Sequence, residues 1–173
     1  IAQKLYEGVN IGSETTGLIT YMRTDGVQLS SQAIEELREE IINRHGKDYI
    51  PQIPRVYKSK AANAQEAHEA IRPTSISRDP DDMSQYLDTE QFKLYELIWK
   101  RTISSQMQSA ELDETSADIS NKDMSIVFRA NGSQVSFPGF FIYRDREDDK
   151  ILPKLLENDK VDLQKADGEQ HFT

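Results

Sequence analysis

The segment "DTEQFKLYELIWKRTISSQM" (residues 88–107) decides the fold of the first part of this chain. Its charged residues are interrupted by apolar ones at helical spacing, which is the pattern of a helix with one buried face. We expect that face to consist of Phe92, Tyr95, Ile98, Trp99 and Ile103. The pattern predicts the longest helix of the chain, and it ends where the character of the sequence changes.

Beyond residue 108 the chain consists of short runs that favour strands, separated by Asn-Gly, Asp-rich or Asn-Asp breaks. The runs are "ETSADIS", "MSIVFRA", "SQVSFPGFFIY" and "KVDLQKA". The dipeptide Asn131-Gly132, between the second run and the third, is a strong signal for a tight hairpin turn. Together these runs predict an all-β module over residues 109–173.

The residues before the long helix favour further helices. "IAQKLYEGV" (1–9) places its apolar residues on one helical face. "SSQAIEELREEIINRHG" (30–46) predicts a helix that Ser30 or Ser31 caps and Gly46 ends. Its expected buried stripe is Ile34, Leu37 and Ile41.

Three shorter segments complete this half. "NAQEAHEAIRP" (63–73) predicts a short helix that ends before its proline. "LITYMRT" (18–24) favours a strand, whereas residues 50–57 should be a loop and "RDPDDM" (78–83) a polar turn. The fold class is therefore α+β, with a mainly helical module over residues 1–108 followed by the all-β module.

The composition excludes several classes of protein. The chain of 173 residues is 36% hydrophobic and 29% charged, as in globular proteins, and it has no cysteine for a disulfide or a zinc site. Its longest apolar run, around residues 137–143, is too short to span a bilayer. It opens on Ile1 without a signal segment, so we interpret it as a piece of a larger cytoplasmic protein.

The net charge of −9 is unevenly distributed. Residues 1–78 carry ten basic and ten acidic side chains, whereas residues 79–173 carry eleven basic and twenty acidic ones. Any group that binds phosphate is therefore expected in the first half.

Two clusters in that half carry side chains suited to phosphate chemistry. In "GLITYMRTDG" (17–26), a strand would place Tyr21 and Arg23 on one face, where a guanidinium could favour the phenolate and bind phosphate oxygens. In "AHEAIRPT" (67–74), His68 and Arg72 would share one face of a helix, near Lys58 and Lys60. Both clusters also have ordinary structural interpretations, and Arg72 could simply pair with Glu69 or Glu66.

No other catalytic pattern is present. The sequence lacks a glycine-rich phosphate loop, GxSxG and HExxH. The acidic runs at residues 79–82 and 146–150 are interpreted as solvated turns rather than metal sites, because no ordered ligand set accompanies them.

The segments "IAQKLYEGV", "GLITYMRTDG", "NAQEAHEAIRPT" and the terminal "EQHFT" resemble successive landmarks of bacterial topoisomerase I, a type IA DNA topoisomerase. The resemblance covers essentially the whole chain, and Met22 fits topoisomerase I. One residue departs from the family pattern, because Gly26 stands where the family commonly has serine.

This resemblance implies that Tyr21 is the nucleophile that joins one DNA strand through a 5′-phosphotyrosine link. It implies that Arg23 contacts the scissile phosphate and that His68 belongs to the same site. The role of Arg72 as a phosphate ligand is inferred only from its charge and position. The fold implied is part of the toroidal core, with the tyrosine-bearing domain at 1–108 and part of the β hinge domain at 109–173.

The resemblance also implies an ATP-independent enzyme that relaxes negatively supercoiled DNA. The Mg²⁺ site and an acidic catalytic residue would belong to a Toprim domain upstream of this chain, so we expect no metal here and no cleavage by the chain alone. The expected partners are DNA, preferably single-stranded, and the remaining domains of the same polypeptide, with no membrane.

Two other classes of protein are weighed against this interpretation. Tyrosine recombinases and type IB enzymes also combine tyrosine with arginine and histidine, but they place an H-x-x-R-type motif before a late tyrosine, the reverse of the order here. A non-catalytic DNA- or protein-binding module is the alternative in which "YMRTD" is purely structural.

Overall fold

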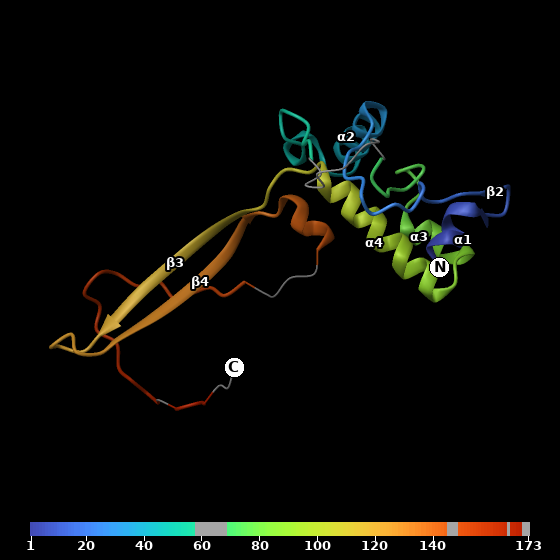
Figure 1. Ribbon diagram of the computed structural model, residues 1–173. Helices are drawn as coiled ribbons and strands as arrows, with labels where there is room; N and C mark the ends of the chain where they lie inside the picture. The colour runs from blue at the N-terminus through green and yellow to red at the C-terminus, as the bar shows by residue number, and fades with distance from the viewer. Residues whose placement is uncertain (58–68, 145–148, 166, 171–173) are drawn as a thin grey trace. The chain divides into compact units, whose positions relative to one another are not determined.

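The computed structural model describes residues 1–57, 69–144, 149–165 and 167–170 (Figure 1). The chain forms two compact units, one of Ile1–Ala110 with Pro138–Arg146 and the other of Glu111–Phe137 with Glu147–Thr173. The first unit is helical and the second is built on two strands, so the α+β class is confirmed. The division into domains at 1–108 and 109–173 stays a prediction.

The described residues of the first unit form the helices α1 (Ala2–Glu7), α2 (Ser31–His45), α3 (Pro80–Met83) and α4 (Thr89–Ser105). Short 3-10 turns lie at η1 (Lys47–Tyr49), η2 (Ser84–Tyr86) and η3 (Gly139–Tyr143). Strands β1 (Val9–Asn10) and β2 (Thr15–Thr16) form a small antiparallel pair.

Helix α4 is the centre of the first unit's core, as its pattern predicts. The Asp88 side chain accepts hydrogen bonds from the amides of Glu90 and Gln91, so a capping box begins the helix. Tyr95, Trp99 and Ile103 are fully buried. Their neighbours in the core come from several elements: Leu5, Leu18, Ile19, Leu37 and Ile41. Phe92 and Ile98, expected on the same face, are only half-buried.

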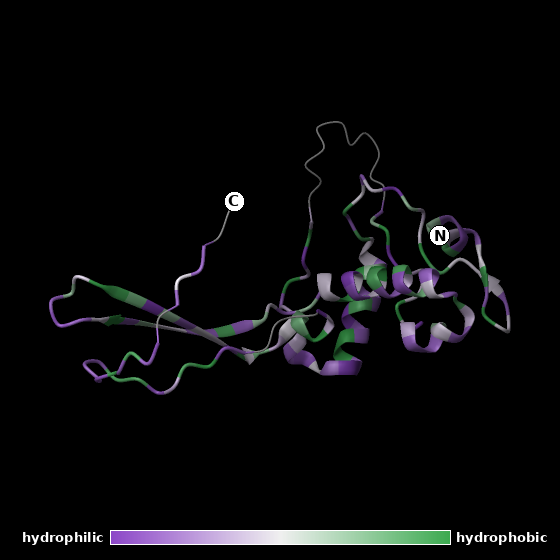
Figure 2. Ribbon diagram, turned by 90° about the horizontal axis from the view of Figure 1, so that it is seen from below, coloured by the Kyte–Doolittle hydropathy of each residue, from purple (hydrophilic) through white to green (hydrophobic). Residues whose placement is uncertain are grey.

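Helix α2 also follows its sequence signals. The Ser30 hydroxyl accepts a hydrogen bond from the amide of Ala33, and the helix ends at Gly46, whose φ of 93° favours glycine. Leu37 and Ile41 are buried as expected, but Ala33 is buried where Ile34 was expected and Ile34 is half-buried. Figure 2 shows that hydrophobic and hydrophilic residues alternate along the helices of this unit.

Three predictions for this unit are wrong in their details. Residues 18–24 form no regular strand, and among them only Ile19 makes an isolated bridge, to Pro73. The described end of the expected 63–73 helix, residues 69–73, is not helical. Residues 80–83 are not a turn but helix α3, because Asp79 caps it and Pro80 occupies its first position.

The second unit is built on the antiparallel pair of β3 (Glu111–Ser120) and β4 (Val127–Phe137). The hairpin predicted at Asn131-Gly132 is wrong, because β4 runs unbroken through both residues. Asn121 closes the actual turn instead, and its side-chain oxygen accepts a hydrogen bond from the amide of Ile126 at 3.1 Å. The pairing of β4 with β3 therefore outweighs the local turn preference of the Asn131-Gly132 dipeptide.

Gly132 has a different role in β4. Residues Ser133 and Lys150 exchange backbone hydrogen bonds of 2.8 and 3.0 Å, which brings residues 150–152 close to the strand. A Cβ atom at Gly132 would lie 2.7 Å from the Lys150 carbonyl oxygen, so glycine permits this approach.

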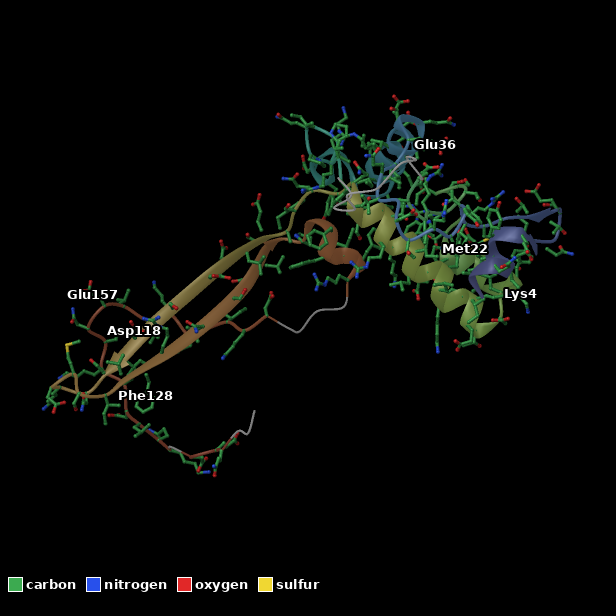
Figure 3. The ribbon with its side chains drawn as sticks, in the orientation of Figure 1. Lys4, Met22, Glu36, Asp118, Phe128 and Glu157 are labelled. Atoms are coloured by element: carbon green, nitrogen blue, oxygen red, sulfur yellow. The ribbon has the colours of Figure 1, made fainter. Side chains whose placement is uncertain are left out.

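The strand pair is largely solvent-exposed. In Figure 3, Asp118 is labelled on β3 and Phe128 on β4, and Phe128 is 56% exposed. Asp118 pairs with Arg129 across the strands at 2.7 Å. Two other expected strands are absent from the described residues, because 139–143 form η3 and 160–165 have no regular structure.

Candidate active site

The structure brings together the two segments that the sequence singled out. The amide of Thr20 donates to the carbonyl of Arg72 at 2.8 Å, and the amide of Thr74 donates to the carbonyl of Leu18 at 3.0 Å. Further along, the amide of Ala70 donates to the carbonyl of Gln28 at 2.8 Å. These main-chain bonds place residues 17–20 beside residues 70–74.

The side chain of Thr20 strengthens this junction. Its hydroxyl donates to the carbonyl of Ala70 at 3.1 Å and accepts from the amide of Arg72 at 3.0 Å. A second hydroxyl links the two segments in the opposite direction, because the Thr74 side chain donates a hydrogen bond to the carbonyl of Gly17 at 2.7 Å. The backbone that leads into Tyr21 is therefore held on both sides.

Tyr21 itself projects into solvent. Its side chain is 57% exposed, whereas Leu18 and Ile19 just before it are buried. Among the described residues, none forms a hydrogen bond to its hydroxyl, and its ring makes an edge-to-face contact with Tyr6 on α1 at a centroid distance of 5.3 Å. An exposed phenol on an anchored backbone is accessible to a large substrate.

The chain turns directly after Tyr21. The amide of Arg23 donates to the carbonyl of Tyr21 at 3.0 Å, which folds the backbone over Met22, labelled in Figure 3. The expected strand geometry, in which Tyr21 and Arg23 alternate onto one face, is therefore not formed. Arg23 is exposed, so both side chains reach the surface of this segment.

Arg72 is engaged by a carboxylate, as its structural interpretation allowed. Its guanidinium donates to both carboxylate oxygens of Glu69, at 2.7 and 3.2 Å, and to the carbonyl of Pro73 at 3.0 Å. Burial alone would raise the pKa of Glu69, but hydrogen bonds from Arg72 and Ser30 lower it overall. Glu69 thus neutralises much of the charge that Arg72 would offer to a phosphate.

His68, together with Lys58 and Lys60, lies outside the described residues. Of the four predicted site residues, the structure therefore describes Tyr21, Arg23 and Arg72. It joins Thr20, the residue before Tyr21, to the backbone of Arg72 by hydrogen bonds.

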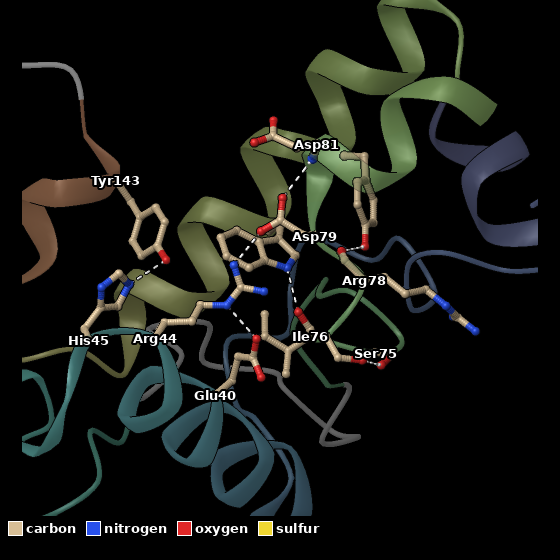
Figure 4. A network of polar contacts seen from close by, with 12 residues as sticks. Glu40, Arg44, His45, Ser75, Ile76, Arg78, Asp79, Asp81 and Tyr143 are labelled. Carbon is tan, nitrogen blue, oxygen red and sulfur yellow. Dashed lines mark hydrogen bonds and ion pairs between the residues drawn. The ribbon is translucent and has the colours of Figure 1, made fainter.

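A polar network that sequence reasoning missed supports the chain just beyond this junction (Figure 4). Arg44 of α2 forms ion pairs with Glu40 and Asp79, and its guanidinium lies 5.1 Å from the Trp99 ring centroid. The Trp99 indole donates to the carbonyl of Ile76 at 2.8 Å. Residues 76–79 are thereby fastened to α2 and α4.

Two aromatic hydroxyls complete the network. Tyr95 donates to the carbonyl of Arg78 at 2.7 Å, and burial raises the pKa of this phenol, so it remains a donor. His45 Nε2 lies 2.7 Å from the Tyr143 hydroxyl (Figure 4). Burial, with the nearby charge of Arg44, lowers the pKa of His45. Sequence spacing gives no sign of these contacts, since Arg44 and Asp79 are 35 residues apart.

Neither a metal centre nor a membrane segment occurs in the part of the chain that the structure describes. No group of three or more histidine and acidic side chains there could hold a metal ion. These residues therefore do not fit a Mg²⁺ site. No described helix has the length and apolarity needed to cross a bilayer.

An exposed tyrosine on a backbone held by hydrogen bonds, two residues before an exposed arginine, is compatible with covalent phosphodiester chemistry. Comparisons with known proteins indicate the same class of protein. The family model described as DNA topoisomerase matches residues 1–173, and the chain belongs to this family, in its bacterial type IA branch. Relatives named DNA topoisomerase 1 include those of Rickettsia bellii, 51% identical, and Helicobacter pylori strain 26695, 45% identical. Each alignment covers 100% of this chain.

The chain spans only about a fifth of the length of these relatives, 22% and 23% respectively. A solved structure of full-length topoisomerase I from Thermotoga maritima is 35% identical, with a TM-score of 0.75. That match covers 90% of this chain and 24% of the Thermotoga chain.

Proposed function

We propose that this chain is the tyrosine-bearing part of an ATP-independent topoisomerase that relaxes negatively supercoiled DNA in the bacterial cytoplasm. The observation that carries the proposal is the placement of Tyr21, which is 57% exposed on a backbone held by hydrogen bonds to residues 70–74. A nucleophile must be reachable by a DNA strand yet fixed in position, and this placement meets both needs.

The proposed reaction conserves the number of phosphodiester bonds. The Tyr21 hydroxyl loses its proton to solvent, and its oxygen forms a bond to phosphorus while the bond from phosphorus to the 3′-oxygen breaks. The 3′-oxygen takes up a proton and leaves as a 3′-hydroxyl, with the 5′-phosphate bound to Tyr21. After strand passage the 3′-hydroxyl reverses the step, so no ATP is required.

Arg23 is assigned to the scissile phosphate. Arg23 is exposed two residues after Tyr21, and its guanidinium would stabilise the negative charge that grows on the phosphate oxygens in the transition state. His68 is proposed for the same site on the strength of the family resemblance alone. Arg72 is proposed as a second phosphate ligand, although it would have to exchange part of its contact with Glu69 to bind DNA.

The full-length protein would supply what this chain lacks. The described residues offer no Mg²⁺ site, so we propose that the Toprim domain of the same polypeptide binds the ion, and that the isolated chain does not cleave DNA. The proposed substrate is single-stranded DNA. Because the positive charges of the first half would contact the phosphate backbone, its affinity should fall steeply as salt increases.

The test uses the full-length protein with supercoiled plasmid and Mg²⁺, without ATP. Tyr21→Phe keeps the ring but removes the attacking oxygen, so relaxation and the covalent complex with a 3′-labelled oligonucleotide should both be abolished. Tyr86→Phe is the matched control, since Tyr86 is 36% exposed in η2 and has no proposed role. Normal relaxation by Tyr21→Phe would rule out the proposed nucleophile.

A further inference from the structure

The contact between Tyr6 and Tyr21 joins the candidate nucleophile to helix α1. Their ring centroids are 5.3 Å apart at an interplanar angle of 62°, an edge-to-face arrangement. Tyr6 is 41% exposed, so its ring lies at the surface beside Tyr21 rather than in the core. Among the described residues, Tyr6 supplies the aromatic ring that contacts Tyr21.

The backbone around this contact is tightly fitted. The carbonyl of Leu5, within α1, accepts hydrogen bonds from the amides of Leu18 at 2.7 Å and Ile19 at 3.4 Å. Gly17 packs against the carbonyl of Tyr6 so closely that a Cβ atom at this position would collide with it. The end of α1 and the segment leading to Tyr21 therefore form one rigid junction.

The Tyr21 side chain projects from this junction and is 57% exposed. No described residue forms a hydrogen bond to its hydroxyl, and the ring of Tyr6 makes an edge-to-face contact with its ring. An edge-to-face partner favours a narrow range of orientations. A ring held in this way directs the phenolic oxygen, whereas a freely rotating ring would spend less time near the attacking geometry.

We propose that Tyr6 is a positioning residue for the reaction: its ring holds Tyr21 in the orientation from which the phenolic oxygen attacks DNA. The inference rests on the proposed function. It assigns Tyr6 no chemistry, so the ring matters and the Tyr6 hydroxyl does not. An exposed tyrosine ring can instead stack on a DNA base, and in that role Tyr6 would change the affinity for DNA rather than the rate of cleavage.

The experiment separates cleavage from binding in the full-length protein with Mg²⁺. The variants are Tyr6→Phe, Tyr6→Leu and Tyr6→Ala, with Tyr86→Ala as a control of similar exposure. Single-turnover formation of the covalent complex with a 3′-labelled single-stranded oligonucleotide gives the cleavage rate. Fluorescence anisotropy of the same oligonucleotide without Mg²⁺ gives the affinity, and thermal melting verifies folding.

We expect Tyr6→Leu and Tyr6→Ala to slow cleavage about 2- to 12-fold at unchanged affinity, the range that an aromatic pair contributes. Tyr6→Phe should restore the normal rate, and Tyr86→Ala should not change it. An unchanged rate in Tyr6→Ala overturns the inference, as does a loss confined to affinity, which would indicate base stacking. Covalent complex formation by Tyr21→Phe would instead refute the proposed function, whatever the Tyr6 variants do.

Discussion

The amide of Thr20 and the carbonyl of Arg72 are joined by a hydrogen bond of 2.8 Å across 52 residues of sequence. The Thr20 hydroxyl adds a second link, because it accepts from the amide of Arg72 at 3.0 Å. One residue thus connects the segment that carries Tyr21 to the segment that carries Arg72. The junction is made mostly by main-chain atoms, which fixes position without depending on side-chain charge.

Replacing the hydroxyl at this junction should destabilise the fold. Thr20→Val keeps the shape of the side chain but leaves the Ala70 carbonyl and the Arg72 amide without their partner, which should cost about 1–3 kcal/mol. Urea denaturation followed by the fluorescence of Trp99, the single tryptophan, measures this. The exposed Thr24→Val should change the free energy of unfolding by less than about 0.5 kcal/mol. Equal effects would contradict the role of Thr20.

Arg23→Ala should damage cleavage far more than folding. Loss of a group that stabilises transition-state charge should lower the single-turnover cleavage rate of the full-length protein about a hundredfold. The Arg23 side chain is exposed, so the free energy of unfolding should change by less than about 0.5 kcal/mol. Arg101→Ala, at another exposed arginine, on α4, should cleave normally. A fall in stability matching the fall in rate would mark Arg23 as structural.

The pKa of His45 predicts how stability depends on pH. Burial and the charge of Arg44 lower this pKa below its ordinary value of 6.5, so the unfolded chain binds the proton more readily. The stability contributed by His45 is present above pH 6.5 and is lost as the pH falls from 6.5 through the lower pKa of the folded state. Urea denaturation between pH 5 and 7 should show this loss, and His45→Gln should reduce it. An unchanged slope would refute the assignment.

Gly132→Ala should detach residues 150–152 from β4. The added methyl group would lie 2.7 Å from the Lys150 carbonyl oxygen and 2.8 Å from Leu152 Cγ, so the pairing of Ser133 with Lys150 must give way, at about 1–3 kcal/mol. Hydrogen exchange of the Ser133 and Lys150 amides should accelerate. Gly168→Ala, where no atom lies within 4 Å of the added carbon, is the matched control.

Helical spacing predicted the elements that depend on local sequence. The helices α2 and α4, their caps and the burial of Leu37, Ile41 and Trp99 follow from periodic apolar residues. Elements that depend on hydrogen-bond partners far along the chain could not be predicted in the same way. Residues 18–24 have the composition of a strand, yet their main-chain hydrogen bonds go partly to Leu5 of α1 and partly to the irregular segment 72–74. Asn131 and Gly132 lie within β4, which pairs with β3 at ten positions.

The candidate site divides in the same way. Tyr21 and Arg23 could be predicted as site residues because both lie in one short segment, and their roles stay predictions. The bridging role of Thr20 and the support from Arg44 were missed, since each depends on a contact across 35 residues or more. The contact of Tyr6 with Tyr21 likewise depends on the fold, because it requires the end of α1 to pack against Gly17.

The polypeptide chain leaves the first unit after Ala110 and returns to it at Pro138. The amide of Phe140 donates to the carbonyl of Gln108 at 3.0 Å, and Gly139, with a φ of 48°, packs directly against Ser109. The exit and the return are therefore neighbours in space. In engineering terms, a short connector could replace residues 111–137, and residues 147–173 could be removed with them because both segments belong to the second unit. The tyrosine-bearing body could then be produced and screened separately.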